Sequence, residues 1–495
     1  MISSPTSADA PCATPGRRLP ALSVVLALAA GLLLRLWFAG HAATIAGDTL
    51  IYGDIAKNWL DHGVYGFTQT AAPPQPTLIR LPGYPAFLVL CFTLFGREHY
   101  TAVIYSQVAL DLFTCLILAS LAGRLFGRRA FYAALWLATL CPFTANYPAT
   151  GLAETLTLTC IGLAFYALHR WQEVFQSSSR ESSSRESSSR ETALQPTPYN
   201  RWLFLLAATL SYAILLRPEQ GLLAAAILPA MLWTAWHGHN APADRLRQST
   251  PVLLTALLVV LPLVPWTLRN WNTFHVFQPL APRYATDPGE HVPLGFQRWY
   301  RTWAIDFAST EDVYWNYDGA PIEITDLPSR AFDNDSQYAR TDALIADYDL
   351  TAKASPALDA RFQALAEERI HADPIRYYLA LPAARLLNMA FRPRTEMLPV
   401  ALEWWKFREH PAQASFSIAY ATLNLACFAL AGFGLRRWRN LSRKGLPWNG
   451  YPALAWSMIA TIALRSALLL TLDNSEPRYT LEFFPILIIA IAART

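Results

Sequence analysis

Runs of apolar residues, each close to the length that a membrane helix needs, recur throughout this 495-residue chain. The first lies at about residues 22–38, and others follow at about 102–122, 250–268 and 414–434. A helix needs roughly 20 apolar residues to cross the hydrocarbon core of a bilayer. With 53% hydrophobic and only 15% charged residues, the chain is too apolar for an ordinary soluble protein. The sequence therefore predicts an all-α polytopic membrane protein.

Basic loops orient these spans. Arg17-Arg18, the cluster at 124–129 and the loop at 436–444 should be cytoplasmic, because Lys and Arg accumulate on that side of a membrane. Residues 82–96 are too short to span comfortably, and a full crossing there would place 124–129 outside. We therefore expect 82–96 to dip into the outer leaflet, within a bundle of about 10–11 membrane helices. The remaining spans are expected at about 130–147, 155–170, 202–216, 220–236, 451–472 and 480–493.

Composition divides the chain into four parts. Acidic residues and prolines set 271–411 apart, and this stretch is long enough for a small extracytoplasmic α or α+β domain. The segment 172–200 holds three copies of Ser-Ser-Ser-Arg-Glu, so we expect a disordered cytoplasmic linker there. The four parts are a cytoplasmic tail at 1–19, an N-terminal transmembrane module at 20–270 with an outer loop at 41–81, the domain at 271–411, and C-terminal transmembrane helices at 412–495.

The first outer loop begins with two carboxylates, Asp48 and Asp54. A helix that starts near Asp48 would place Tyr52, Ile55 and Trp59 on one face, and such an amphipathic helix is expected to rest on the bilayer surface. Asp48 has two interpretations at this point. It is either a helix cap or a general base that accepts a proton from a substrate hydroxyl beside a lipid-borne group.

Further polar residues fall where this topology predicts the outer face. They are Glu154, Arg217, Glu219, Arg269, Glu476, Arg478 and Tyr479. Taken alone, each has the simpler interpretation that it flanks a span. Arginines at an outer-face cavity nevertheless suit a phosphate, through charge-assisted and often bidentate hydrogen bonds. Arg35 is placed to snorkel or to meet a phosphate, and Arg465, in mid-span, is expected to pair with a neighbouring helix.

In order and spacing, these residues resemble the large integral-membrane glycosyltransferases with the GT-C fold. The nearest groups are the dolichyl-phosphate-mannose protein mannosyltransferase superfamily and the aminoarabinose transferase of lipid A. The resemblance covers most of the chain, although each motif is only a few residues long. The motifs are Gly47-Asp48 with Tyr52 and Ala56, Arg80-Leu81-Pro82-Gly83-Tyr84-Pro85, Leu125-Phe126-Gly127, Glu154, Pro265-Trp266 with Arg269-Asn270, and Glu476-Pro477-Arg478-Tyr479 with Pro485.

The resemblance implies an inverting transfer of a sugar from a polyprenyl-phosphate donor to an acceptor on the extracytoplasmic face. The aspartate that acts on the acceptor in that family corresponds to Asp48, and Glu154 corresponds to a second acidic position. Arg478, and then Arg217, are the expected partners of the lipid phosphate, with Arg80 and Arg269 as further choices. The residues expected to line the substrate pocket are Tyr52, Asp54, Tyr84, Glu219, Glu476 and Tyr479.

The same resemblance implies the partners and the location. The partners are a polyprenyl-phosphate-linked sugar, membrane lipids and an acceptor lipid, glycan or protein. The location is the inner membrane of a bacterial cell envelope, with the site facing the periplasm or the cell exterior. A net charge of +4 gives no indication of nucleic acid. The histidines show no ligand spacing and the six cysteines form no framework, so we expect no metal, cofactor or disulfide.

Two departures from the family pattern argue against assuming the same substrate. Arg80-Leu81 stands where the aminoarabinose transferase has an acidic-basic pair, and no large repeat insertion of the protein mannosyltransferase type is visible. A transporter or flippase of a lipid-linked anion is the leading alternative, although it would need charges near the midplane and internal repeats. A non-catalytic scaffold of an envelope complex, and an oligosaccharide ligase or polymerase with a diphosphate-linked donor, remain open.

Overall fold

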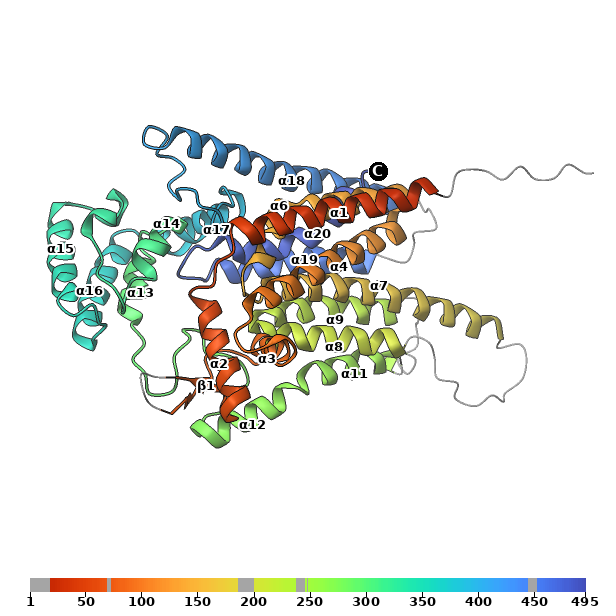
Figure 1. The fold of residues 1–495 in the computed structure, drawn as a ribbon, viewed down its shortest axis with the longest axis horizontal. Coiled ribbons are helices and arrows are strands. Elements are labelled where there is room, and N and C mark those ends of the chain that lie inside the picture. Colours follow the sequence, from red (N-terminus) through yellow and green to blue (C-terminus); the bar gives the residue numbers. More distant parts are fainter. Residues whose placement is uncertain (1–17, 69–72, 186–199, 237–244, 247, 444–451) are drawn as a thin grey trace, which may run out of the picture.

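The computed structural model is a bundle of long helices with a smaller group of helices at one end (Figure 1). It describes residues 18–68, 73–185, 200–236, 245–246, 248–443 and 452–495. Five of the described helices are long and apolar enough to cross a membrane, namely Ala21–His41, Tyr100–Phe126, Thr250–Phe274, Pro411–Asn440 and Pro452–Leu469. The predicted fold class, a polytopic helical bundle, is therefore confirmed.

The bundle helices are α1 (Arg18–His41), α3 (Gly83–Phe95), α4 (Tyr100–Phe126), α5 (Arg128–Leu140), α6 (Pro142–Ala145), α7 (Glu154–Arg185), α8 (Asn200–Leu216), α9 (Gly221–Trp236), α11 (Thr250–Val260), α12 (Leu263–Phe274), α18 (Pro411–Arg443), α19 (Pro452–Leu469) and α20 (Phe484–Ala492). Most of the bundle helices follow one another closely, but the first outer loop separates α1 from α3 and the residues after Phe274 separate α12 from α18. Three short 3-10 turns lie between them, η2 (Tyr147–Ala149), η3 (Pro218–Gln220) and η8 (Pro477–Phe483). The first outer loop contains α2 (Asp48–His62) and an antiparallel ribbon of β1 (Gly66–Phe67) and β2 (Gln75–Pro76).

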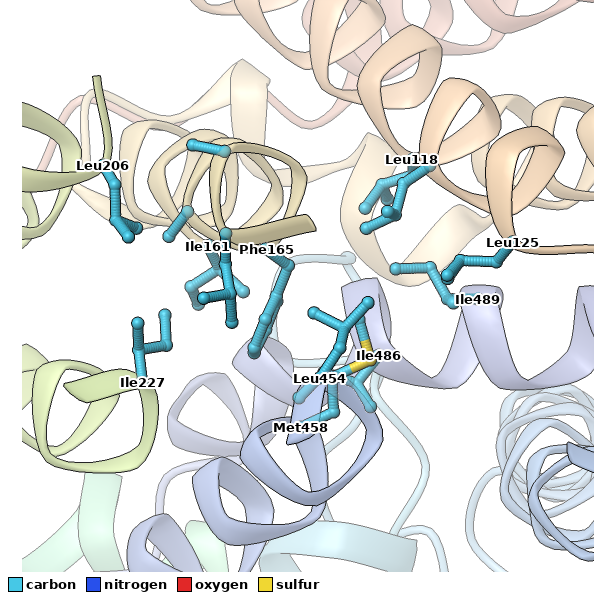
Figure 2. Close-up of a cluster of buried hydrophobic side chains, with 14 of the residues drawn as sticks. Leu118, Leu125, Ile161, Phe165, Leu206, Ile227, Leu454, Met458, Ile486 and Ile489 are labelled. Atoms are coloured by element: carbon cyan, nitrogen blue, oxygen red, sulfur yellow. The ribbon is translucent and has the colours of Figure 1, made fainter. Parts of the chain in front are cut away.

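The inner faces of these helices form one apolar core (Figure 2). Its side chains come from distant parts of the sequence, including Leu118 of α4, Phe165 of α7, Ile227 of α9, Met458 of α19 and Ile489 of α20. All five are buried. The first and second halves of the chain therefore share a single core.

Apolar side chains also cover the outside of the bundle. Leu33 of α1 is 68% exposed and Leu257 of α11 is 59% exposed. Lipid chains are as apolar as leucine, so helices with such outer faces are stable in a bilayer and would not be stable in water. The exposed faces therefore agree with a membrane location.

The two basic clusters lie at one end of the bundle. Phe126, at the end of α4, packs edge-on against Trp438 of α18, with ring centroids 5.0 Å apart. The clusters at 124–129 and 436–439 therefore lie together, opposite the end at which α1 leads into α2 (Figure 1). This arrangement agrees with the cytoplasmic side that the sequence predicts for both clusters.

Helix α3 lies across its neighbours and is seen almost end-on in Figure 1. It has only 13 residues. Near its start, Tyr84 packs against Tyr52 of α2, with ring centroids 5.0 Å apart. After its end, Arg97 pairs with Asp61 of α2 at 2.7 Å. Because both ends of α3 lie beside α2, this helix does not carry the chain to the other end of the bundle, as predicted for 82–96.

A second group of helices caps the end of the bundle at which α2 lies (Figure 1). It consists of α13 (Leu294–Tyr300), α14 (Phe307–Ser309), the π-helical turn η4 (Thr310–Tyr314), η5 (Ile324–Asp326), η6 (Ser329–Ala331), α15 (Asp335–Asp349), α16 (Pro356–Ala372), the π-helical turn η7 (Arg376–Ala380) and α17 (Leu381–Phe391). Trp299, Trp303, Tyr348 and Phe362 are buried in a separate aromatic core. Every residue of 271–411 is described, and none of them forms a strand, so this part is α rather than α+β.

Two expectations need correction. The segment 172–200 is not a linker from its start, because α7 continues as a helix to Arg185; residues 186–199, like residues 1–17 of the tail, lie outside the described part of the chain. Arg35 neither snorkels nor faces a phosphate. It is fully buried, its Nε donates to Asp111 Oδ2 at 2.6 Å, and its Nη1 donates to the carbonyls of Gly31 and Thr139. A charge inside the bundle is retained because it is paired.

The Arg35–Asp111 pair gives a prediction about stability. Asp111→Leu should lower the stability by about 3–5 kcal/mol, because Arg35 stays buried without its counter-ion. Thermal unfolding in detergent would show this as a lower Tm. As a control, Asp61→Leu breaks the exposed pair with Arg97 and should cost about 0–1 kcal/mol. An equal Tm for the two variants would contradict the prediction.

Candidate functional site

Asp48 is the first residue of α2, and its carboxylate does not cap that helix. Gly47 precedes it with a φ of 53°, a left-handed conformation that glycine adopts readily. No side chain caps the N-terminus of α2. The interpretation of Asp48 as only a helix cap is therefore wrong, and its carboxylate is available for other partners.

Two arginines from distant parts of the chain bind Asp48. Nη2 of Arg80 donates to Oδ1 at 2.8 Å, and Nη2 of Arg478 donates to Oδ2 at 3.1 Å. Burial raises the pKa of Asp48, but the charges of Arg478 and Arg80 outweigh it and lower the pKa to about 2. Asp48 is therefore ionised, and both its oxygens are engaged.

Arg478 connects Asp48 to two further carboxylates. Its Nε donates to Glu476, and its Nη1 lies 3.8 Å from Oε1 of Glu154. Tyr479 donates its hydroxyl to Oε1 of Glu476 at 2.9 Å. Glu154 begins α7, where the helix dipole favours an acidic side chain. The turn at 476–479 therefore holds Arg478 between the starts of α2 and α7.

Arg217 and Arg465 extend this network. Arg217 donates to Glu154 at 2.9 Å and to Glu219 at 2.8 Å. Arg465 of α19 lies 3.4 Å from Glu219 and 3.0 Å from Glu482, which confirms that it pairs with neighbouring elements. Four arginines and five carboxylates thus form one connected group at the end of the bundle.

Close backbone contacts fix the elements that carry these groups. A side chain at Gly83 would lie 2.5 Å from the carbonyl carbon of Leu215, so glycine is needed for the turn before α3 to approach α8. A side chain at Gly151 would lie 2.5 Å from Cγ2 of Thr49, where the loop before α7 meets α2. These contacts hold the start of α2, the turn before α3 and the ends of α7 and α8 around one point.

Two cavities meet at the Arg80–Asp48–Arg478 bridge, which lines both of them. The smaller cavity has a volume of about 360 Å³ and extends between α8, η3 and α19. The larger cavity has a volume of about 920 Å³ and extends towards α14 and η4. Asp48 can therefore reach a molecule in either cavity, or a bond formed between molecules in both.

Most of the residues predicted from the sequence line these cavities. Asp48, Tyr52, Arg80, Glu154, Arg217, Glu219, Arg478 and Tyr479 line the smaller cavity, and Glu476 lines the larger one. Three predicted residues lie elsewhere. Arg269 donates to two backbone carbonyls of the first outer loop, at 2.7 and 2.8 Å. Asp54 accepts a hydrogen bond from the backbone N–H of Thr68, and the buried Tyr84 donates to Gln107. Arg269 and Asp54 support the first outer loop, Tyr84 links α3 to α4, and none of the three lines either cavity.

The cavities also contain residues that the sequence did not indicate. They are Arg283, Tyr284, Phe307, Glu311, Tyr314, Trp315, Glu396 and Asp473. Asp473 has the same sequence signal as the predicted residues, because it stands three residues before Glu476 at the end of a predicted span. The other seven residues belong to no sequence pattern that would place them at a cavity. Within the described residues, no three His, Cys, Asp or Glu side chains are grouped as a metal ion would require.

The family model described as a protein of unknown function with an HXXEE motif matches residues 160–267. Within this stretch, residues 169–173 read His-Arg-Trp-Gln-Glu, which has glutamine in place of the first glutamate of the motif. His169 lies 3.4 Å from Glu173, which also pairs with Arg124. None of these residues lines either cavity. No curated protein matches the sequence.

Several solved structures are similar to the chain. ArnT from Cupriavidus metallidurans bound to undecaprenyl phosphate has 17% identity and a TM-score of 0.38, with 90% of this chain and 76% of that chain covered. Archaeal oligosaccharyltransferase AglB from Archaeoglobus fulgidus, in complex with an inhibitory peptide and a dolichol-phosphate, has 10% identity and a TM-score of 0.46, with 96% and 50% covered. The chain thus spans about half the length of the archaeal enzyme. These proteins have the GT-C fold that the sequence resembles, and at such identities the likeness concerns the fold alone.

The Asp48 bridge gives a prediction about ionisation. Arg478→Gln should raise the pKa of Asp48 above about 2, because burial still opposes its charge while one of two guanidinium groups is gone. Infrared difference spectra against the same protein with Asp48→Asn would isolate the carboxylate band during a pH titration. Arg97→Gln, which removes an arginine from the exposed pair with Asp61, should leave that pKa unchanged. The assignment would be contradicted if the pKa of Asp48 were the same in the two variants.

Proposed function

We propose that this chain is an inverting glycosyltransferase that moves a sugar from a polyprenyl-phosphate donor to an acceptor on the extracytoplasmic face of the membrane. The observation that carries the proposal is a carboxylate held by two arginines at the point where two cavities meet. Transfer between two substrates needs two binding spaces and one group that reaches both. Asp48 is in that position.

The smaller cavity suits the donor phosphate. Five arginines and three carboxylates line it, and leucines of α8 and α19 supply an apolar wall. Arginine binds phosphate through parallel charge-assisted hydrogen bonds. The apolar wall suits the first isoprene units of a lipid chain. A lipid-linked phosphate matches both parts of this lining.

Donor binding must displace a carboxylate, because each arginine of the network already holds one. Asp48 is the most readily displaced, since its side chain is 26% exposed, against 5% for Glu154 and 2% for Glu476. A phosphate presents two unesterified oxygens to Arg80 and Arg478, as the Asp48 carboxylate does. The donor therefore replaces Asp48 on its arginines and frees it to act as a base.

The proposed reaction is a direct displacement at the anomeric carbon. Asp48 accepts the proton of the acceptor hydroxyl while that oxygen forms a bond to the anomeric carbon from the face opposite the phosphate. The bond between that carbon and the phosphate oxygen breaks, and its electron pair leaves with the lipid phosphate. Arg478 and Arg80, with Arg217 behind them, stabilise the charge on this leaving group. Inversion follows from the single displacement.

The orientation in the membrane follows from charge. The cavities lie at the end of the bundle away from the basic clusters at 124–129 and 436–439, and such clusters remain cytoplasmic. In the inner membrane of a bacterial envelope, the site would face the periplasm. Two of the similar structures contain undecaprenyl phosphate or dolichol-phosphate, the chemical class of the proposed donor lipid.

Replacing the base should separate chemistry from binding. Asp48→Asn should lower sugar transfer by about 10²–10⁴-fold, because an amide cannot accept the proton. It should bind undecaprenyl phosphate at least as tightly as the unmodified chain, because the amide competes less for Arg80 and Arg478. Transfer from short-chain polyprenyl-phosphate sugars in proteoliposomes, together with the Kd for the lipid phosphate, measures both effects.

Asp54→Asn is the matched control. Asp54 lies on the same helix, accepts hydrogen bonds from Thr68 and lines neither cavity, so transfer should continue at the normal rate. Full transfer by Asp48→Asn would show that Asp48 is not the base. Movement of an intact donor across the membrane without cleavage would instead identify a transporter.

Displacement of Asp48 by the donor also predicts a difference between two pH profiles. The acid limb of kcat/KM reports the free enzyme, in which the pKa of Asp48 is about 2. The acid limb of kcat reports the enzyme–donor complex, in which the arginines have turned to the phosphate and burial raises that pKa. As pH falls, kcat should therefore decrease at a higher pH than kcat/KM. Coincident acid limbs would show that the donor leaves the bridge intact.

A further inference from the structure

The wall of the larger cavity opposite Asp48 is formed by the helices of 271–411. The π-helical turn η4 follows α14 directly, and Glu311, Tyr314 and Trp315 at this turn all line the cavity. Helices with π-helical turns often occur at functional sites. The wall facing the reactive centre is therefore built from an irregular element with large side chains.

Trp315 differs from the other tryptophans of this helical group. Its side chain is 48% exposed, whereas Trp299 and Trp303 are each 1% exposed in the aromatic core. One edge of Trp315 is supported by Phe307, with ring centroids 5.4 Å apart and the rings nearly perpendicular. Tyr284 and Tyr314 add further aromatic surface to the cavity. A supported ring that stays open to a cavity suits a flat, partly apolar face of a ligand.

Glu311 supplies a solvent-exposed hydrogen-bond acceptor on the same turn, four residues before Trp315. Its carboxylate makes no hydrogen bond or ion pair with any residue that the structure describes. Partial burial raises the pKa of this carboxylate, while the charge of Arg392 lowers it. Its oxygens are open to the cavity, so the hydroxyl groups of a ligand there can replace water as its hydrogen-bond donors.

Among the other charged residues of the larger cavity, Arg478 and Asp473 have ionic partners, and Glu396 accepts a hydrogen bond from Tyr147. Asp48 and Glu476 hold Arg478, and Asp473 lies 3.3 Å from Arg301 and 3.7 Å from Arg283. The cavity therefore offers aromatic faces and a hydroxyl acceptor at one wall, and a network of ion pairs at the other. A lipid chain would exclude water from Glu311 and offer no hydrogen-bond donor in its place, whereas a sugar ring has both an apolar C–H face and hydroxyl groups.

We infer that the acceptor is a carbohydrate, held in the larger cavity with a ring against Trp315 and hydroxyl groups on Glu311. This inference rests on the proposed function only in making the bound carbohydrate the acceptor of the transfer. Binding of the carbohydrate itself can be tested without transfer. A hydroxyl of the bound carbohydrate faces Asp48 across the cavity. The helices of 271–411 thus select the acceptor, while the bundle binds the donor.

The first experiment measures equilibrium binding of maltotriose and chitotriose to the full chain in lipid nanodiscs, by saturation-transfer NMR and calorimetry. Trp315→Ala should weaken binding about threefold to tenfold, because a stacking face is lost. Glu311→Gln should weaken it by about tenfold, because a charged acceptor is lost. Trp405→Ala and Glu409→Gln are matched controls: both residues are exposed, neither lines a cavity, and both variants should bind as the unmodified chain does.

The second experiment measures transfer with the same variants and with carbohydrate, peptide and lipid acceptors. The acceptor KM should rise in Trp315→Ala and Glu311→Gln, while the donor KM and the Kd for undecaprenyl phosphate stay unchanged. The inference is overturned if neither trisaccharide binds, if both variants bind as the controls do, or if only peptide or lipid acceptors are used. If the trisaccharides bind through Trp315 and Glu311 but no lipid phosphate binds and no donor is consumed, the proposed function fails and the carbohydrate site stands.

Discussion

The salt bridge of Asp48 with Arg80 and Arg478 is the interaction on which the site depends. It joins the start of α2, the turn before α3 and the turn before α20, and Asp48 and Arg478 are 430 residues apart in the sequence. Removing water from three charged groups is expensive, and their mutual attraction repays that cost only when the geometry is good. The bridge therefore fixes the relative positions of three elements that share no continuous secondary structure.

The same bridge explains how one site can be stable when empty and reactive when filled. Without a ligand, the carboxylate satisfies the arginines, and its pKa of about 2 makes it a poor base. In the proposed reaction, a phosphate takes over the same arginines and leaves the carboxylate in partly buried surroundings without its counter-charges. The basicity of Asp48 would then rise only when a donor is bound, which would limit unproductive reactions of an empty site.

The sequence predicted the bundle and much of the site, because both depend on patterns along the chain. Asp48, Glu154, Arg217 and Arg478 interrupt apolar runs at ends that the basic loops orient in one direction. Arg269 also ends an apolar run at the same face, but its guanidinium donates to backbone carbonyls of the first outer loop. Those hydrogen bonds form only because the loop folds back onto α12, which the sequence pattern does not indicate. Trp315 lies among many tryptophans of ordinary appearance. Only packing shows which tryptophan stays open to a cavity, so no linear pattern could indicate it.

The separation of the bridge partners has a consequence for biosynthesis. A ribosome releases Asp48 and Arg80 into the membrane long before it makes Arg478, which lies just before α20. Until then, Asp48 lacks one of its two partners and the turn at 476–479 cannot close the cavities. A product that stops before Arg478 would therefore lack one of the two guanidinium groups that hold Asp48, and in the proposed reaction it would have no working centre.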